Sequence, residues 1–329
     1  MSKRKTKKNK NFKSFLFILF LLIVAAVFIY TSTNYEVQQE DFEASSTAAT
    51  TAEAQTERPV AAPVSVAPVS AADISFDYEE NNPLYFGNPS KATSEPDDEA
   101  NHLMEKAQYT LSYNNINLGP NWVAWHLSSS DLGDSGRSDK FIADKSLPKD
   151  WYSVKQSDYQ FASYGFDRGH VCPSADRTVS EEDNQATFYM TNMLPQAPDC
   201  NRIVWKDLES YERQQALDGN ELYIFAGGVG QGGTGNRGYF EEILLKNGQT
   251  ILVPEYCWKI LIILPEGDND FERMATEAEI VSVCVPNQQG CQNNGSWDQY
   301  KCSINYIEEI THLDFLDLLP DDLEELLED

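Results

Sequence analysis

The sequence has few positive charges: it contains 25 lysine and arginine residues against 52 acidic residues, and its formal net charge is −27. Seven of those bases lie within the first thirteen positions, so the rest of the chain is more acidic still. This shortage excludes a broad basic surface of the kind that binds polyanions. Any basic patch must be local, and its candidate members are Arg137, Lys140, Arg168, Arg177, Arg202 and Lys206.

A nucleotide-binding glycine loop is also missing. Six glycines lie between Gly228 and Gly238, but no Lys-Ser/Thr pair follows them and no helix is expected there. We therefore predict a flexible loop at the edge of a sheet. Internal repeats are absent from the sequence, apart from a doubled Ala-Pro-Val-Ser before position 71.

Long apolar runs are lacking except near the N-terminus, where a basic segment at residues 1–14 precedes apolar residues 15–33. We expect residues 15–33 to be a transmembrane anchor with its basic flank in the cytoplasm. A cleaved export signal is the alternative, although the sequence contains no clear Ala-x-Ala cleavage site. Residues 34–81 are rich in Ala, Thr, Pro and Ser and predict a disordered tether. Residues 82–329 are then a folded domain outside the cytoplasm, in the periplasm or at the cell exterior, and secreted if the signal is cleaved.

Cysteine is scarce: the chain has six, all of them beyond the apolar run. An even number on the exported side of a membrane indicates disulfides. Cys284, Cys291 and Cys302 lie in or beside a polar loop that would need such a bridge, and Cys172 could pair with Cys200. Six cysteines allow many connectivities, so the pairing stays open.

The residues with the clearest chemistry gather in Tyr164–Arg177, which reads YGFDRGHVCPSADR. We expect Asp167, Arg168, Gly169 and His170 to form a tight turn in which the glycine provides backbone freedom. A histidine titrates near neutral pH and can take a proton from water. The planar guanidinium of Arg168 suits a phosphate group. The alternative is a surface turn in which Asp167 and Arg168 merely pair.

Two further stretches add to this motif. Residues 186–196, ATFYMTNMLPQ, predict a strand that presents Asn192 near its end. Residues 199–213 predict a helix that Asp199 caps and Gly219 terminates. Three residues are expected to share one flank of that helix: Asn201, Trp205 and Glu209.

In this order, the motifs DRGH, TNMLPQ and NRxxWxxLE resemble those of the sugar-non-specific DNA/RNA endonucleases with a ββα-metal site. The similarity extends from about Asn82 to the C-terminus. It implies that His170 is a general base that activates water and that Asn201 is the sole protein ligand of a magnesium ion. Asp167 would help to hold the water shell of that ion.

The same resemblance assigns roles to four more residues. Glu209 would act through metal-bound water near the leaving group. Arg137, in GRSDKF, matches the arginine that holds the phosphate, and Arg168 and Asn192 match residues that support the site.

Helix geometry is compatible with a single protein ligand. Asn201 and Glu209 are eight positions apart, or roughly 12 Å along a helix at about 1.5 Å per residue, so both cannot bind one ion directly. Magnesium tolerates few protein ligands because it keeps several waters and binds substrate phosphate. Manganese is expected to substitute for it.

Residues Trp258–Leu264 are nearly all apolar and predict a central strand, and Ser303–Leu319 predict a helix. Strands before the site, one long helix after it and a β-rich second half indicate an α+β fold with a central antiparallel sheet and flanking helices. The resemblance implies the ββα-metal, or His-Me finger, nuclease fold. The main hypothesis is a membrane-tethered, magnesium-dependent endonuclease that hydrolyses DNA and RNA with little sequence preference and leaves 5′-phosphate ends. No motif identifies a protein inhibitor or an oligomer interface.

Two alternatives stay open at this point. The first is a non-catalytic zinc or nucleic-acid-binding module outside the cytoplasm, with zinc held by His170, Cys172 and Cys200. The nearby thiols and the acidity favour it, but it leaves Asn201 and Glu209 without a role. The second is a nuclease restricted to small nucleotides.

Overall fold

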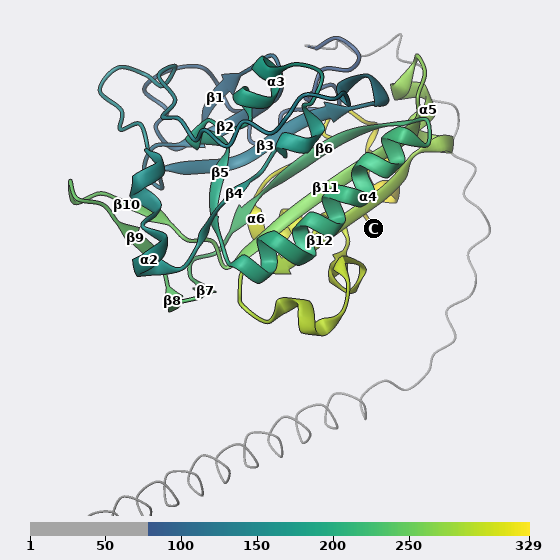
Figure 1. Cartoon of the computed structure of the whole chain (residues 1–329). Helices are drawn as coiled ribbons and strands as arrows, with labels where there is room; N and C mark the ends of the chain where they lie inside the picture. The colour runs from purple at the N-terminus through teal and green to yellow at the C-terminus, as the bar shows by residue number, and fades with distance from the viewer. Residues whose placement is uncertain (1–77) are drawn as a thin grey trace, which may run out of the picture. The chain divides into compact units, whose positions relative to one another are not determined.

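A seven-stranded antiparallel sheet organises residues 78–329, the part of the chain that the computed structural model describes (Figure 1). The strand order is β1-β2-β3-β6-β11-β12-β13, and each neighbouring pair is antiparallel. The strands are β1 (His102–Glu105), β2 (Thr110–Asn114), β3 (Gly119–Leu127), β6 (Asn220–Val229), β11 (Tyr256–Pro265), β12 (Glu279–Pro286) and β13 (Lys301–Cys302). The predicted central antiparallel sheet is confirmed.

Strand β11 shows why the sheet forms here. It pairs with β6 on one side and β12 on the other, and both of its faces are covered. Trp258 and Ile260 belong to one core and Leu261 and Ile263 to the other, so nearly every position must be apolar. The predicted interior strand is confirmed, with one polar exception, the fully buried Lys259.

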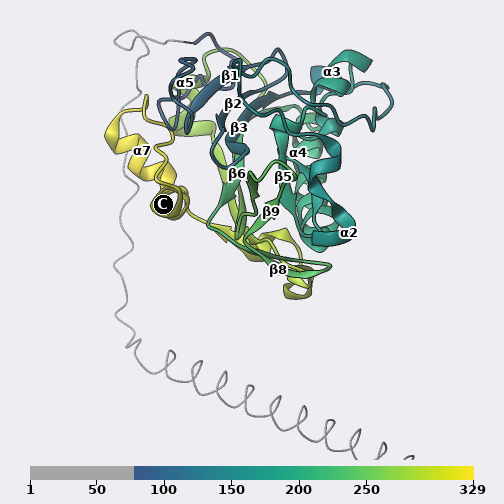
Figure 2. The same ribbon diagram turned by 90° about the vertical axis from the view of Figure 1, so that its left-hand side faces the viewer.

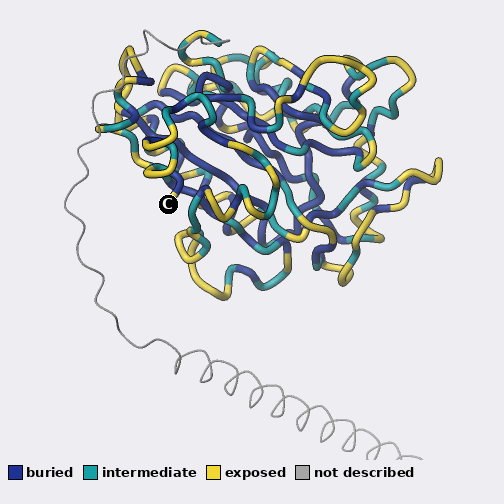
Figure 3. The backbone as a smooth tube through the Cα atoms, turned by 180° about the vertical axis from the view of Figure 1, so that it is seen from behind, coloured by how far each residue is buried: buried dark blue, intermediate teal, exposed yellow. Residues whose placement is uncertain are grey.

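Different elements cover the two faces of the sheet. Helix α4 (Lys206–Leu217) and the short strand pair β4 (Asp167–His170) and β5 (Met193–Gln196) lie on one face. Helices α5 (Asp270–Glu277), α6 (Ile304–Thr311) and α7 (Asp321–Glu328) contribute to the core on the other face. Figure 2 shows α4 and α7 on opposite sides of the strands. In Figure 3 the buried residues follow the strands, and the exposed residues concentrate in the loops.

The remaining elements are short. Two hairpins lie outside the main sheet: β7 (Gly233–Gly235) with β8 (Gly238–Phe240), and β9 (Glu242–Leu244) with β10 (Thr250–Leu252). The other helices and turns are η2 (Ser129–Asp131), η3 (Gln156–Tyr159), α2 (Phe161–Tyr164), η4 (Ser174–Asp176), α3 (Glu181–Ala186), η5 (Met190–Asn192), η6 (Cys200–Trp205), η7 (Cys291–Asn294) and η8 (Trp297–Tyr300).

Two of the predicted elements are shorter than expected. The strand expected over residues 186–196 is limited to β5, because Met190–Asn192 form a 3₁₀ turn in which the Asn192 amide donates to the carbonyl of Tyr189. The helix expected beyond Ser303 ends at Thr311, where His312 takes a left-handed conformation with φ 60°. A left-handed residue reverses the chain direction and ends the helix.

The predicted membrane anchor at residues 15–33 and most of the tether lie outside the described residues. Within residues 78–329, no helix is both long and apolar enough to cross a membrane.

All six cysteines lie in the described part of the chain, and each is a free thiol there, so the predicted disulfides are not confirmed. The thiol of Cys200 hydrogen-bonds with Cys257 and Cys291, and these contacts, with burial, raise its pKa. The thiols beside Cys200 are those of Cys257 on β11 and Cys291 in η7, and Cys172, the partner considered from the sequence, is not among them.

Candidate active site

His170, the last residue of β4, lies at the centre of the site. Its side chain is 8% exposed and packs edge-on against Phe188, with the ring centroids 4.6 Å apart. The Nε2 atom is itself buried, and no described residue hydrogen-bonds with it. Burial first, and then the charges of Arg137 and Arg168, lower the pKa of His170 to about 3. The imidazole is therefore neutral near pH 7 and carries a lone pair that is free to accept a proton.

The Asp167–His170 stretch is a strand and not the tight turn that the sequence predicted. Its alternation places Arg168 and His170 together on the wall of the cleft. Gly169 is required for a different reason from the one expected. Its φ is not in the left-handed region, but a Cβ atom there would overlap the side chain of Gln196 on β5. The glycine allows the close approach of the two strands.

Two arginines from different segments join His170. Arg137, from the loop after η2, donates from Nη1 to Ser174 Oγ at 2.6 Å and from Nε to Asp139 Oδ1 at 2.6 Å. The guanidinium carbon of Arg168 lies 4.4 Å from the ring centroid of Phe141, and its Nε atom is buried without a partner among the described residues. Both side chains line the cleft and hold donors suited to phosphate oxygens.

Asn201 lies in η6, a π-helical turn that leads directly into α4. Its Nδ2 donates to Asp167 Oδ2 at 3.0 Å, and no described residue donates to its Oδ1. Asp167 also accepts from Arg202 Nε at 2.7 Å and from Arg202 Nη2 at 2.6 Å. Asp167 thus fixes the amide of Asn201 so that its oxygen is available. The predicted cap by Asp199 is wrong, because that carboxylate accepts from the Gly290 amide instead.

The π turn also changes which residues share a flank. Asn201 and Glu209 both line the cleft, as predicted, but Trp205 is buried at 1% exposure. In a regular α-helix the three would lie close to one line, and the wider turn rotates Trp205 into the core. Widened turns of this kind are frequent at functional sites.

Glu209 is half-buried and supplies the single acid among the described residues that line the cleft. Burial raises its pKa to about 7, and the nearby Asp176 adds to that rise. The charges of Lys259, Arg213 and Arg137 oppose it. Near neutral pH this carboxyl group is therefore close to its midpoint.

A buried ion pair joins helix α4 to strand β11 of the central sheet. Lys259 Nζ on β11 lies 2.7 Å from Glu212 Oε1, and both side chains are fully buried. The ammonium also lies 4.7 Å from the ring centroid of Trp205 and 5.1 Å from that of Trp125. No sequence motif includes this pair, although Lys259, a single charge within an apolar strand, was a signal for it. Ser174, which orients Arg137, was also missed and gave no signal of its own.

The predicted local basic patch is largely present. Four of its six candidate members line the cleft, which has a volume of about 350 Å³: Arg137, Arg168, Arg202 and Lys206. Arg177 is buried and donates to backbone carbonyls of Gln108 and His126, so it is structural. Lys140 is exposed but does not line the cleft.

Asn192, which the motif matches to a residue that supports the site, does not line the cleft. Its side chain is 0% exposed, accepts from the Cys172 amide at 2.9 Å, and donates to the carbonyls of Cys172 and Thr187, each at 2.9 Å. Its amide therefore ties the end of β4 to η5. The side chain is fully engaged in that support and cannot also reach a ligand.

The predicted zinc alternative is also wrong. Within residues 78–329, no group of three or more His, Cys, Asp or Glu side chains is arranged to hold a metal ion. Burial raises the pKa of the Cys172 thiol, and Cys200 is surrounded by other thiols. His170, Cys172 and Cys200 therefore do not form a shared site.

Comparisons with known proteins point to one enzyme family. The profile of the DNA/RNA non-specific endonuclease family matches residues 87–322, inside the predicted domain of residues 82–329. A protein named Nuclease from Nostoc sp. is 43% identical over 233 residues, which cover 71% of this chain and 80% of that protein. Nuclease C1 from Cunninghamella echinulata is 28% identical over 241 residues, covering 72% of this chain and 88% of that protein.

Among solved structures, the crystal structure of the EndoG/EndoGI complex contains a similar chain. The match has a TM-score of 0.57 and 23% sequence identity, and it covers 72% of this chain and 91% of that chain. At this identity the likeness is one of fold. It confirms the predicted ββα-metal architecture with a central antiparallel sheet.

Proposed function

The chain belongs to the DNA/RNA non-specific endonuclease family and is a hydrolytic nuclease, and from that premise we propose a metal-dependent endonuclease in which His170 is the general base. The observation that carries this proposal is the neutral His170 side chain. Its side chain lines a cleft with Arg137, Asn201 and Glu209, and its buried Nε2 has no hydrogen-bond partner among the described residues. A neutral imidazole whose partner position is open can accept a proton from an attacking water molecule.

The residues of the cleft fit a divalent cation of the magnesium type. Asn201 Oδ1 is free of hydrogen bonds from described residues and the Glu209 carboxyl lies on the same wall, so the cleft offers the oxygen ligands that magnesium prefers. We assign Asn201 as the ligand and Asp167 as the residue that orients it. A bound magnesium or manganese ion would stabilise the charge that develops on the phosphate and the leaving oxygen.

The side chains then divide the reaction between them. The neutral His170 imidazole takes the proton of the attacking water, whose oxygen forms a bond to phosphorus. Arg137 and Arg168 bind the non-bridging phosphate oxygens, where negative charge increases. The bond between phosphorus and the 3′ oxygen breaks, and a proton from solvent or from the Glu209 side of the cleft completes the 3′ hydroxyl. The products carry a 5′ phosphate and a 3′ hydroxyl.

Nicking of supercoiled plasmid tests this function. The purified protein should convert the plasmid to open circles in magnesium and lose that activity in EDTA. DNA ligase should reseal the nicks, because it requires a 5′ phosphate beside a 3′ hydroxyl. His170→Ala should lower the rate by about 10²- to 10⁴-fold without unfolding the domain. His312→Asn is the matched control, since His312 is exposed on the far face and asparagine tolerates its left-handed conformation.

Two results would contradict the proposal. Full activity of His170→Ala would show that His170 is not the general base. Failure to nick a circular substrate would show that the enzyme acts only on ends or on small nucleotides. The same assay on a structured RNA compares the two substrate classes directly.

We also propose that the nuclease domain acts outside the cytoplasm, on a membrane tether. The basic segment at residues 1–14 followed by the apolar residues 15–33 supports this. Protease added to spheroplasts, whose outer layers have been removed, should digest the domain. Protection until the spheroplasts are lysed would show that the domain lies in the cytoplasm.

A further inference from the structure

A second groove, of about 670 Å³, opens beside the catalytic cleft. We call it the Phe161 groove and define it by Phe141, Lys155, Gln156, Ser157, Phe161 and Arg168. Its described lining contains two bases and no acid, in a chain that has twice as many acids as bases. The nearby Asp158 is already engaged, since it accepts from the Tyr152 hydroxyl and from the Lys155 amide. The groove therefore favours an anionic ligand.

The groove continues from the catalytic cleft. Arg168 lines both cavities, so one guanidinium lies between them. Arg202 lines the cleft, and its guanidinium carbon lies 5.8 Å from the ring centroid of Phe161. A chain with a phosphate in the cleft would thus have its neighbouring nucleotide in the Phe161 groove.

Phe161 presents an aromatic face at this position. Its side chain is 38% exposed, although a phenyl ring is normally buried. The short helix α2 that carries it is fixed to the β9 strand: Gln160 Nε2 donates to the Leu244 carbonyl at 3.1 Å, and the Leu244 amide donates to the Tyr164 hydroxyl at 3.1 Å. Figure 1 shows α2 beside the β9–β10 hairpin. The exposed ring is therefore displayed on a fixed support.

The opposite wall is fixed as well. The Ile142 amide donates to the Phe188 carbonyl at 3.1 Å, and the Met190 amide donates to the Ile142 carbonyl at 2.9 Å. These bonds tie residues 141–143 to the segment that leads into β5. Hydrogen bonds between side chains and backbone hold the Phe161 wall, and backbone hydrogen bonds hold this one, so the groove exists before any ligand binds.

An aromatic face next to basic side chains is the arrangement that binds unpaired nucleotides. Every base has a π face, so stacking tolerates any sequence, while the cations bind the backbone phosphates. In a duplex the base faces are covered by their neighbours and cannot reach a side chain without unstacking. This difference distinguishes single strands from duplexes without reading any base.

We propose that the Phe161 groove binds an unpaired nucleotide next to the scissile phosphate, with its base stacked on Phe161 and its phosphate near Lys155 and Arg168. This rests on the proposed nuclease function and deepens it: a single strand of DNA or RNA gains a stacking contact in the groove that a duplex makes only where it opens locally.

Binding tests the groove without relying on catalysis. In a His170→Ala background and in EDTA, a fluorescein-labelled oligothymidylate is titrated and its anisotropy followed, alone and annealed to oligodeoxyadenylate. Phe161→Ala should weaken single-strand binding by about 5- to 150-fold and leave duplex binding within about threefold. Phe161→Trp, which keeps a stacking face, should bind the single strand as the parent does, and Phe161→Leu should not.

Two controls make the result specific. Tyr306→Ala removes an aromatic side chain of similar exposure, 43%, from α6 on the other face of the sheet and should change nothing. With an active enzyme, Phe161→Ala should raise KM for the oligothymidylate but leave turnover of bis(p-nitrophenyl) phosphate unchanged, because that small diester fills only the cleft.

The outcomes separate the two proposals. If Phe161→Ala binds the single strand normally, or loses duplex binding to the same degree, the groove proposal is overturned even when plasmid nicking is normal. If the parent enzyme hydrolyses neither the oligothymidylate nor bis(p-nitrophenyl) phosphate, the nuclease mechanism fails. If Phe161→Ala still loses single-strand binding in that case, the groove assignment stands.

Discussion

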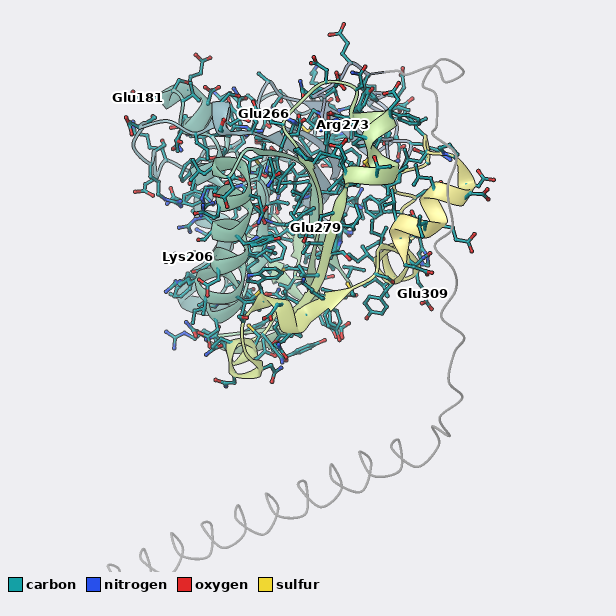
Figure 4. The ribbon with its side chains drawn as sticks, turned by 90° about the vertical axis from the view of Figure 1, so that its right-hand side faces the viewer. Glu181, Lys206, Glu266, Arg273, Glu279 and Glu309 are labelled. Carbon is teal, nitrogen blue, oxygen red and sulfur yellow. The ribbon has the colours of Figure 1, made fainter. Side chains whose placement is uncertain are left out.

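The catalytic cleft and helix α7 lie on opposite faces of the central sheet and carry charge of opposite sign. The catalytic cleft on the α4 face is lined by four bases and a single described acid. Helix α7, on the other face, contains five acids and no base. Figure 4 shows Lys206 on α4 at one side of the molecule and Glu309 near the C-terminus at the other. A formal net charge of −27 therefore conceals a local positive site.

This separation explains how so acidic a protein can bind a polyanion. Screening limits the reach of exposed charges to roughly 8 Å at physiological salt, so acids on the far face act weakly on the cleft. Asp167, which lies next to the cleft residue Arg168, accepts hydrogen bonds from Asn201 and Arg202. We therefore expect charges on the α4 face to control activity, and charges on the α7 face to affect stability alone.

The largest expected effect comes from removing a base of the cleft. Arg137→Ala should lower kcat/KM by about 10²- to 10³-fold, because a donor aimed at the charged transition state is lost. Lys91→Ala is its matched control, since Lys91 is exposed on the far face and pairs with Asp314 at 3.6 Å. Initial rates on plasmid measure both. Equal losses in the two variants would show that overall charge, and not position, controls activity.

The next effect concerns stability beneath α4. Lys259→Met should lower the free energy of unfolding by about 3–5 kcal/mol, because Glu212 is left buried and unpaired. The double replacement Lys259→Met with Glu212→Leu should recover most of that loss. Urea unfolding of the single and double variants gives the coupling energy. The exposed Lys91–Asp314 pair should show none that can be measured, and a comparable coupling there would contradict the distinction.

A third prediction separates Glu209 from His170 by pH. The pKa of His170 is lowered to about 3, so the imidazole is neutral throughout the range from pH 5 to pH 8. The pKa of Glu209 is raised to about 7, so its carboxylate is lost as pH falls through that value. We therefore expect kcat/KM to fall as pH drops below about 7. This acid limb of the pH profile should shift to lower pH as the magnesium concentration increases, because a nearby cation favours the carboxylate. Glu209→Gln should be slower and lack this limb. A limb that persists in Glu209→Gln would assign it to another group.

Much of this arrangement could be predicted from sequence where local pattern determines structure. The apolar run of β11 and the order of the three motifs were sufficient to predict the sheet and to bring His170, Asn201 and Glu209 to one cleft. A motif does not reveal burial, however, and Asn192 belongs to a recognisable motif while serving only as backbone support.

Other features depend on long-range packing. The π turn rotates Trp205 into the core by changing the helical register, which a pattern based on regular helices cannot show. Phe161 resembles an ordinary core residue in FASYGF, and its exposure depends on contacts with Leu244, which is 80 positions or more away in the chain. The Lys259–Glu212 pair likewise joins residues 47 positions apart.

The smallest effect is expected on the α7 face and depends on pH. Burial, with the charges of Glu308 and Glu324, raises the pKa of Glu328 to about 8, so the fold favours its neutral form. The stability from this group is fully present below its unfolded pKa of about 4.5 and is lost as pH rises through 8. Glu328→Gln should match the parent at pH 4 and have a higher Tm, by about 2 to 4 °C, at pH 8.5.

Glu309→Gln, at an exposed position on α6, is the control. Calorimetry at the two pH values measures the difference, and plasmid nicking should be unchanged in both variants. A change in nicking would show that the two faces are coupled, because the acids of α7 would then influence a cleft on the opposite side of the sheet.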